Sequence, residues 1–188
     1  MMKVKITAAA LFCANMLTST SLLADNHTMS IGYAQSKVEH FKNIRGVNLQ
    51  YRYEWDSPLS IIGSFSYMSG DESYSYRNFH FGEIGGFDHK TDLKYYSLLA
   101  GPAYRINDYV SLYALAGVAH TRVKDKITYL SQYSEDFNNS KTSFAYGTGV
   151  VINPTNAFSV NVGYEGTRVK YNDNLAINGF NVGIGYRF

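Results

Sequence analysis

The sequence ends in Gly179-Phe180-Asn181-Val182-Gly183-Ile184-Gly185-Tyr186-Arg187-Phe188, which alternates strictly between two kinds of side chain. Phe180, Val182, Ile184, Tyr186 and Phe188 share one parity, while glycine, asparagine and arginine occupy the other. Because successive side chains of a β-strand point to opposite faces, this stretch predicts a strand with one wholly apolar face. Such a face and an aromatic end suit a barrel wall in lipid. In a soluble sheet, Phe188 would be left in water.

The amino terminus indicates the cellular compartment. A short basic segment, Met1–Lys5, precedes a largely apolar run from Ile6 to Ala24. This pattern predicts a secretory signal over residues 1–24, cleaved to leave a mature barrel of residues 25–188. A membrane anchor is the alternative for this run. The only cysteine, Cys13, falls inside the signal, so the mature chain would have neither disulfides nor thiol chemistry.

The composition favours strands. The chain contains 17 Tyr, 11 Phe and 16 Gly with only 3 Pro, and aromatic residues are enriched in strands. No apolar run after Ala24 approaches the roughly 20 residues of a membrane helix. Without Lys3 and Lys5 the mature chain carries equal numbers of acidic and basic residues, which argues against nucleic-acid binding.

The same alternation recurs along the chain as hairpins with tight, polar turns. The predicted strand pairs are Val47–Trp55 with Leu59–Tyr67, Tyr96–Tyr104 with Val110–Val118, and Phe144–Ile152 with Phe158–Tyr164. Strands at Thr28–Ser36 and at the carboxyl terminus bring the count to eight. The second pair leaves the face assignment open, because Tyr95, Leu99, Tyr113 and Leu115 are apolar on the opposite parity.

The connections between these strands alternate between short and long. Short ones lie near residues 56, 107 and 154, and long ones span Lys37–Arg45, Ser69–Asp92, Val123–Lys141 and Lys170–Leu175. Membrane barrels have short periplasmic turns and longer outer loops, and lipid requires a closed sheet. The predicted fold is therefore all-β: an eight-stranded antiparallel transmembrane β-barrel with four extracellular loops, three short periplasmic turns and both termini periplasmic.

The inward parity predicts a polar lumen. Its members include Arg52, Glu54, Glu165 and Arg187, which we expect to form a barrel-interior polar network. An eight-stranded barrel is just wide enough for its own side chains to fill, so a plugged interior is expected, with a small gated pore as the alternative. A soluble lipocalin-like barrel would reverse the two faces, and parity alone does not decide which face lies inside.

Several segments resemble outer membrane protein X and its relatives, a family that includes the Ail, Lom, PagC and Rck proteins of enteric bacteria. The residues that carry the resemblance are Gly32–Ser36, Tyr51–Glu54, Ser57–Leu59, Ile62–Phe65, Ala100–Asp108 and Gly183–Phe188. The resemblance covers the mature chain and implies a non-enzymatic outer-membrane barrel. It also implies attachment to host cells or matrix, invasion, and resistance to serum complement. The two largest loops match no known adhesive motif, so no binding residue is carried over, and an envelope barrel without adhesion stays open.

The two largest loops are rich in aromatic residues, which protein-binding surfaces use. The candidate partner-binding residues are Tyr74, Tyr76, Arg77, Phe79, Phe81, Phe87, Tyr129, Tyr133 and Phe137. Tyr74-Ser75-Tyr76 alternates, so the sheet could continue beyond the membrane and leave an edge that accepts a partner's strand. Alternatively, these aromatic side chains pack on one another or lie at the lipid headgroups.

The expected partners follow from the predicted location: outer-membrane lipid, lipopolysaccharide and the barrel-assembly machinery, with host matrix proteins or complement regulators outside. A monomer is expected. Basic residues in the first and third loops could form a cluster for heparan sulfate or lipopolysaccharide phosphates, although a solvated surface is the simpler interpretation. The cluster would comprise Lys37, Lys42, Arg45, Lys124 and Lys126.

Catalysis has weak support in the sequence. His80 and His89 share a loop with Asp88, Asp92 and several serines, so the catalytic triad of a small-barrel acyltransferase or protease can be drawn. Loop residues of these types coincide often by chance, and the spacing of His80 and His89 is a weak metal signal. We therefore assign no catalytic, cofactor or metal residue.

Overall fold

The computed structural model describes residues 26–39, 41–80, 83–129, 134–170 and 174–188, and the predicted signal segment lies outside them. The strands are β1 (His27–Val38), β2 (Ile44–Glu54), β3 (Leu59–His80), β4 (Glu83–Arg105), β5 (Val110–Tyr129), β6 (Ser134–Ile152), β7 (Phe158–Lys170) and β8 (Asn174–Arg187). Among the described residues, no helix is long and apolar enough to cross a membrane.

The eight strands form a closed antiparallel barrel in sequence order, with β8 returning to pair with β1. Ile31 of β1, for example, lies opposite Leu49 on one side and Ile184 on the other. The backbone of His27 closes the ring through mutual hydrogen bonds with Phe188, of 3.1 and 2.8 Å. The predicted all-β barrel and its three short turns are confirmed.

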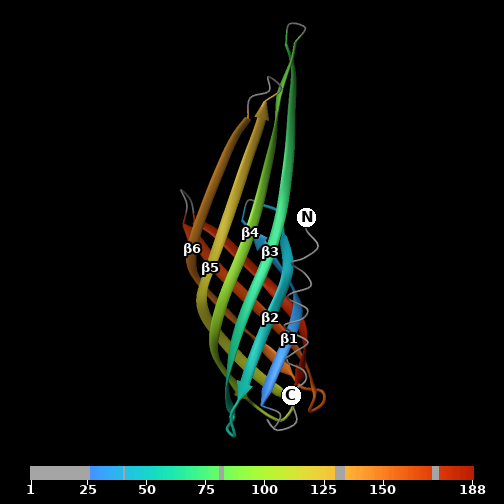
Figure 1. Ribbon diagram of the computed structural model, residues 1–188, viewed down its shortest axis with the longest axis vertical. Coiled ribbons are helices and arrows are strands. Elements are labelled where there is room, and N and C mark those ends of the chain that lie inside the picture. Colours follow the sequence, from blue (N-terminus) through green and yellow to red (C-terminus); the bar gives the residue numbers. More distant parts are fainter. Residues whose placement is uncertain (1–25, 40, 81–82, 130–133, 171–173) are drawn as a thin grey trace, which may run out of the picture.

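Four strands are much longer than the sequence predicts. β3, β4, β5 and β6 have 22, 23, 20 and 19 residues, whereas the other four have 11 to 14. Figure 1 shows these four strands rising far above one side of the barrel. The expected loops Ser69–Asp92 and Val123–Lys141 are thus corrected: they are mostly paired strand. Polar residues lie on both faces of these segments, so most of the sequence there lacks the apolar–polar alternation that indicates a strand.

We call this continuation the extended sheet. It comprises Ser69–His80 of β3, Glu83–Lys94 of β4, Arg122–Tyr129 of β5 and Ser134–Ser140 of β6. The end of the barrel from which it rises is the extended end. The opposite end, with the three short turns and Phe188, is the turn end (Figure 1).

The wall of the barrel is apolar outside and polar inside. Val182 and Ile184 of β8 are 43% and 68% exposed, whereas Arg52 and Glu165 are 4% and 6% exposed. This is the arrangement that lipid requires and a soluble barrel would reverse. The soluble lipocalin-like alternative is therefore wrong. Phe180 and Tyr186 also face outward and are exposed, so β8 presents its predicted apolar face.

The lumen is layered along its length. The turn end holds the arginines and Glu54, and amides and hydroxyls occupy the middle. The extended end is apolar, because Val38, Ile44, Val169 and Ile177 are at most 1% exposed. Inward-facing Tyr95, Leu99, Tyr113 and Leu115 are also buried, which settles the face of the second hairpin.

Candidate binding surface on the extended sheet

The ionic layer of the lumen is built from β2 and β8. Arg52 Nη2 lies 2.9 Å from Glu54 Oε1, and Arg187 Nη2 lies 3.3 Å from Glu54 Oε2. The Arg52 guanidinium also donates to the hydroxyls of Ser60 and Ser111, each at 3.0 Å. A buried charge is tolerated only when it is paired and hydrogen-bonded. This part of the lumen is therefore filled by a network rather than by a ligand site.

Glu165 lies apart from that layer. It accepts hydrogen bonds from Tyr95 at 2.6 Å and from Ser66 at 3.0 Å. Nearby, Asn161 donates to Gln50 at 2.7 Å. The predicted interior set is thus brought together only in part: Arg52, Glu54 and Arg187 pair, while Glu165 joins the hydroxyl and amide layer. The sequence places these residues inside but does not give their heights along the barrel.

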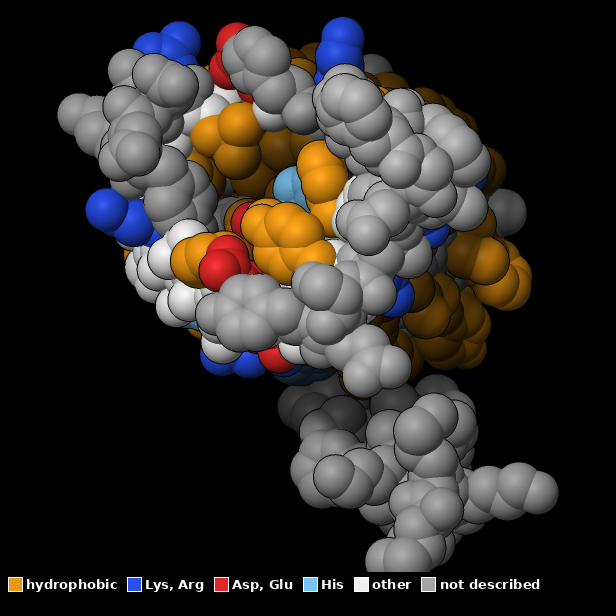
Figure 2. Space-filling view, turned by 90° about the horizontal axis from the view of Figure 1, so that it is seen from above, with side chains coloured by type: hydrophobic (Ala, Val, Ile, Leu, Met, Phe, Trp, Pro, Cys, Tyr) orange, Lys and Arg blue, Asp and Glu red, His pale blue; other side chains and the backbone are white. Residues whose placement is uncertain are grey.

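The extended sheet has two chemically different faces. One continues the lumen side of β3–β6, and we call it the inner face; the other continues the lipid side, and we call it the outer face. The exposed aromatic side chains belong to the inner parity together with Glu72, Asp125 and Glu135. The lysines and arginines of the extended sheet belong to the outer parity, together with Asp71, Asp88, Asp92 and Asp136. Figure 2 looks down on this end: apolar and acidic side chains and a histidine lie in the middle, and the lysine and arginine side chains stand around the rim together with further acidic ones.

The inner face carries a row of rings across three strands. Tyr76 of β3 and Phe87 of β4 have ring centroids 5.8 Å apart, and Phe87 and Tyr129 of β5 are 6.2 Å apart. These rings contact one another because cross-strand neighbours on one face of a sheet lie close enough for aromatic side chains to interact. Tyr74 and Phe137, on the same face, are 59% and 51% exposed. Much of the ring surface is therefore available to a partner.

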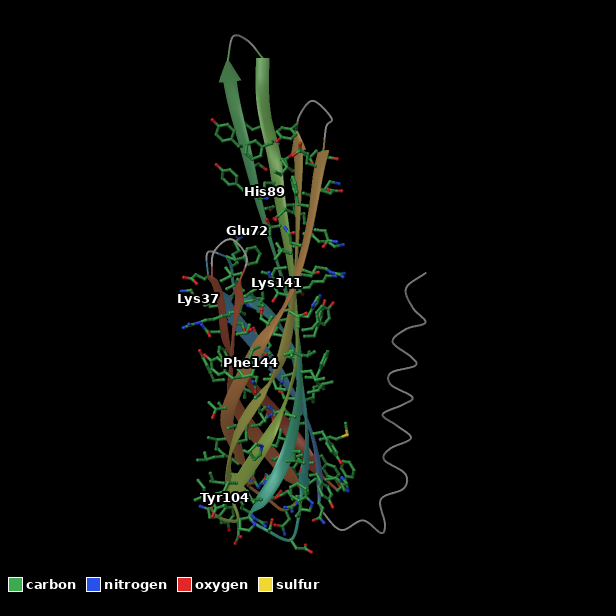
Figure 3. All side chains as sticks on the ribbon, turned by 90° about the vertical axis from the view of Figure 1, so that its left-hand side faces the viewer. Lys37, Glu72, His89, Tyr104, Lys141 and Phe144 are labelled. Atoms are coloured by element: carbon green, nitrogen blue, oxygen red, sulfur yellow. The ribbon has the colours of Figure 1, made fainter. Side chains whose placement is uncertain are left out.

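Carboxylates lie beside these rings on the inner face. Asp125 accepts a 2.5 Å hydrogen bond from Thr91, and its oxygen lies 3.4 Å from His89 Nε2. Glu72 stands opposite Thr91 in the register, and Lys42 from the first connection lies 3.8 Å from its oxygen. In Figure 3, the labels mark Glu72 and His89 at successive heights of the extended sheet.

The outer face is mainly cationic near its base. Its basic side chains on β4 and β5 are Lys90, Lys94, Arg122, Lys124 and Lys126, and Lys94 lies opposite Arg122. Farther along, Arg77 of β3 pairs with Asp88 of β4 at 2.8 Å. Hydrogen bonds from Ser75 and Arg77 lower the pKa of Asp88 below its usual value, so this pair stays charged over a wide pH range.

The extended sheet has an open edge on β3. Pairing of β2 with β3 ends at Arg45–Ser69, so the described residues beyond Ser69 pair with β4 alone. The uncharged stretch Ser73–Tyr76 lies on this edge. Natural sheets usually protect such an edge with charges or prolines, because unpaired backbone groups accept another strand. β6 has a second edge, because its described pairing with β7 begins at Ala145.

Comparison with known proteins decides the family. The model of the enterobacterial Ail/Lom protein family matches residues 1–188. The chain belongs to the Ail/Lom family. It is 45% identical over 195 residues to the virulence membrane protein PagC of Salmonella typhimurium, with both chains fully covered. It is 35% identical over 182 residues to outer membrane protein X of Escherichia coli K12, with 96% of each chain covered.

A solved structure of an Ail/Lom protein has a similar fold. The crystal structure of Ail, the attachment invasion locus protein of Yersinia pestis, contains the heparin analogue sucrose octasulfate. It is 38% identical, has a TM-score of 0.66, and the match covers 87% of this chain and 99% of that one. The present Ail/Lom chain is therefore an outer-membrane β-barrel.

The predicted partner-binding residues are divided between the two faces of the extended sheet of this Ail/Lom barrel. Tyr74, Tyr76, Phe87, Tyr129 and Phe137 share the inner face, while Arg77 lies on the outer one. The side chain of Phe79 and residues Phe81 and Tyr133 lie outside the described part of the structure. Sequence reasoning missed the carboxylates Glu72, Asp125 and Glu135 as members of the same face. Strand parity assigns each of them to the lumen side of its own strand, but only the register between strands groups them.

The expected basic cluster does not assemble as one group. Lys42 and Arg45 line a cleft with Ser69 and Asp71 beside β3, whereas Lys124 and Lys126 lie on β5, two strands farther along. Lys90, Lys94 and Arg122, which the sequence analysis did not include, are the neighbours of the β5 lysines. The register between β4 and β5 brings them together, and the sequence alone does not give that register.

The residues considered for catalysis are also separated. His89 faces Asp125 on the inner face, while Asp88 and Asp92 have the opposite parity of β4 and lie on the outer face. The triad drawn from the sequence therefore does not form around His89, and the His80 side chain lies outside the described residues. Among the described residues, no group of three potential metal ligands is present.

Proposed function

We propose that this Ail/Lom barrel is a non-enzymatic surface adhesin that supports attachment to host cells or matrix, invasion and resistance to complement. In this proposal the turn end and both termini face the periplasm, and the extended sheet stands outside the cell. The observation that carries the proposal is the open-edged extended sheet with exposed Tyr74, Tyr76 and Phe137. The name of the Yersinia pestis relative, an attachment invasion locus protein, supports it.

Two recognition routes are available on the extended sheet. A host strand could add to the edge of β3 at Ser73–Tyr76, where backbone hydrogen bonds supply affinity with little demand on sequence. Polyanions such as heparan sulfate or lipopolysaccharide phosphates would bind the basic outer face through charge-assisted hydrogen bonds. The heparin analogue bound to the Yersinia pestis relative supports this second route.

Assembly would follow the membrane-strand pattern of β8. We propose that the apolar outward row Phe180, Val182, Ile184, Tyr186 and Phe188 is presented to the barrel-assembly machinery. In the folded state its members contact lipid, because Val182 and Ile184 are exposed on the outside of the ring. Because β1 pairs with β8, the backbone hydrogen-bonding groups of the barrel are paired within one chain, which supports a monomer.

The adhesion proposal is tested with cells that display either the full barrel or a form lacking Tyr74–Phe87. We expect the full barrel to increase binding to immobilised fibronectin, laminin or complement regulators, and the shortened form to lose that increase. Heat-modifiable gel migration of both forms is the control for barrel folding. Unchanged binding by the shortened, folded barrel would contradict a role for the β3–β4 part of the extended sheet.

The polyanion route is tested separately by changing Lys90, Lys94, Arg122, Lys124 and Lys126 to glutamine. We expect heparin binding by the purified barrel to fall more than tenfold, because each charged hydrogen bond contributes about 1.5–3 kcal/mol. Binding by the unchanged barrel should weaken between about 50 and 300 mM salt, as screening shortens the range of the charges. Binding that is insensitive to salt would contradict this route.

A further inference from the structure

The inner face of the extended sheet combines exposed rings with carboxylates at strand spacing. Register places Tyr74, His89, Ile127 and Glu135 in one row across the four strands, and the adjacent row contains Glu72, Thr91, Asp125 and Phe137. A row of rings from Tyr76, Phe87 and Tyr129 lies above them. The face therefore offers negative charge and aromatic surface together, unlike the basic outer face.

From this juxtaposition we infer that the inner face binds an extended peptide segment of a protein partner that carries arginine or lysine side chains. The inference rests on the proposed adhesive function and names the chemistry of its partner. The aliphatic stems of such side chains would cover Tyr74 and Tyr76, and cations are attracted to the faces of aromatic rings. Their charged ends would reach Glu72 and Asp125, where a planar guanidinium matches a carboxylate.

Charge on the two faces supports this occupant over an acidic one. The inner face carries Glu72, Asp125 and Glu135, whereas the bases near it are Lys42, Lys141 and His89. Lys42 already lies 3.8 Å from Glu72, so the chain's own ammonium group occupies the position of a ligand cation. Its side chain is 63% exposed, so a partner's arginine can displace it.

The basic side chains of the outer face do not compete with a ligand for the carboxylates of the inner face, because they lie on the opposite side of the sheet. Arg77 is engaged with Asp88 on that face, and Lys90 lies 3.8 Å from Asp92. In the view from above, the lysine and arginine side chains stand around the rim, and apolar and acidic side chains are visible in the centre (Figure 2). A basic segment on the inner face would therefore meet carboxylates and rings before it meets the outer lysines.

The test uses the full barrel in nanodiscs of zwitterionic lipid and a fluorescent peptide that alternates arginine with serine. The inner variant is Glu72→Gln, Asp125→Asn and Glu135→Gln. Its matched control carries Asp71→Asn, Asp92→Asn and Asp136→Asn, which change the net charge equally but lie on the outer face. We expect the inner variant to bind at least about tenfold more weakly and the outer variant to bind within about twofold of the unchanged barrel.

Two further measurements keep the inference falsifiable. A peptide with citrulline in place of arginine keeps the shape and loses the charge, so it should not bind. Tyr74→Ala with Tyr76→Ala should weaken binding about three- to tenfold through the lost ring contacts. The pair Glu72→Gln and Glu135→Gln leaves the Thr91–Asp125 hydrogen bond intact, in case the triple variant disturbs the local sheet. Equal losses in the inner and outer variants, or citrulline binding as strong as arginine binding, would overturn the inference.

Failure of this inference and failure of the adhesive function give different results. If the inner variant loses no peptide affinity but removal of Tyr74–Phe87 still abolishes host binding, the function stands and the partner chemistry is wrong. If that removal leaves host binding unchanged while the inner variant loses the peptide, the inner face binds cations and the adhesive proposal fails.

Discussion

The barrel and the extended sheet are built from the same strands, yet they follow different rules. Within the barrel every strand has two neighbours, and inward side chains such as Arg52 and Ile177 are almost completely buried. Beyond Ser69 the sheet has free edges, and the exposed Tyr74 and Tyr76 lie on the inner face, which continues the lumen side of the barrel. Closure therefore serves stability in lipid, while the open continuation frees polar and aromatic side chains for recognition.

The largest expected contrast concerns ion pairs. Glu54→Ala leaves the buried Arg52 without its carboxylate, and breaking a buried pair costs about 3–5 kcal/mol. Glu72→Ala removes an exposed pair with Lys42, which should cost less than about 1 kcal/mol. Urea unfolding in lipid vesicles, followed by the fluorescence of the single tryptophan Trp55, measures both changes. Similar losses from the two variants would show that the lumen pair is not buried.

A second contrast concerns apolar packing at the extended end of the lumen. Ile177 is 1% exposed, so Ile177→Ala removes buried contacts and should cost about 2–5 kcal/mol. Ile127→Ala on the inner face of the extended sheet should cost less than about 1.5 kcal/mol, because that side chain is already partly in water. The same unfolding assay compares them. An equal cost would mean that the extended sheet unfolds together with the barrel.

A third contrast tests where lipid ends. Val182→Arg places a charge on the outward face of β8 and should cost about 2–4 kcal/mol if that position lies near the bilayer midplane. Thr128→Arg lies on the outer face of the extended sheet, where a surface change should stay within about 0.5 kcal/mol. Folding yield into vesicles, judged by heat-modifiable migration, reports both. If Val182→Arg left the folding yield unchanged, the interpretation that the outer side of β8 faces lipid would be wrong.

The sequence predicted the barrel well because a period of two indicates a strand and separates the side chains of its two faces. It anticipated only a continuation at Tyr74–Tyr76, since charges on both faces of the extended sheet hide the alternation elsewhere. It left Tyr95 and Leu99 unassigned, because apolar residues fall on both parities of β4. The inner face was missed for a different reason: grouping Asp125 with Glu72 requires the register of three strands, which a single sequence does not contain.

The smallest expected effect is a local response of the extended sheet to acid. The folded pKa of Asp88 is lowered from 3.8 by hydrogen bonds from Ser75 and Arg77, so these contacts are at full strength above that value. They are lost as the pH falls through the lowered pKa, because a protonated Asp88 binds its donors less strongly. Protection of the Ser75 and Arg77 amides against hydrogen exchange, relative to their intrinsic exchange rates at each pH, should therefore decrease as the pH falls below 3.8, while the β8 amides of the closed barrel stay protected. Since the Asp88 side chain is 51% exposed, the change should be slight, and Asp88→Asn should abolish its pH dependence. An identical acid response in Asp88→Asn would assign the loosening to other carboxylates and remove Asp88 from the difference between the two regions.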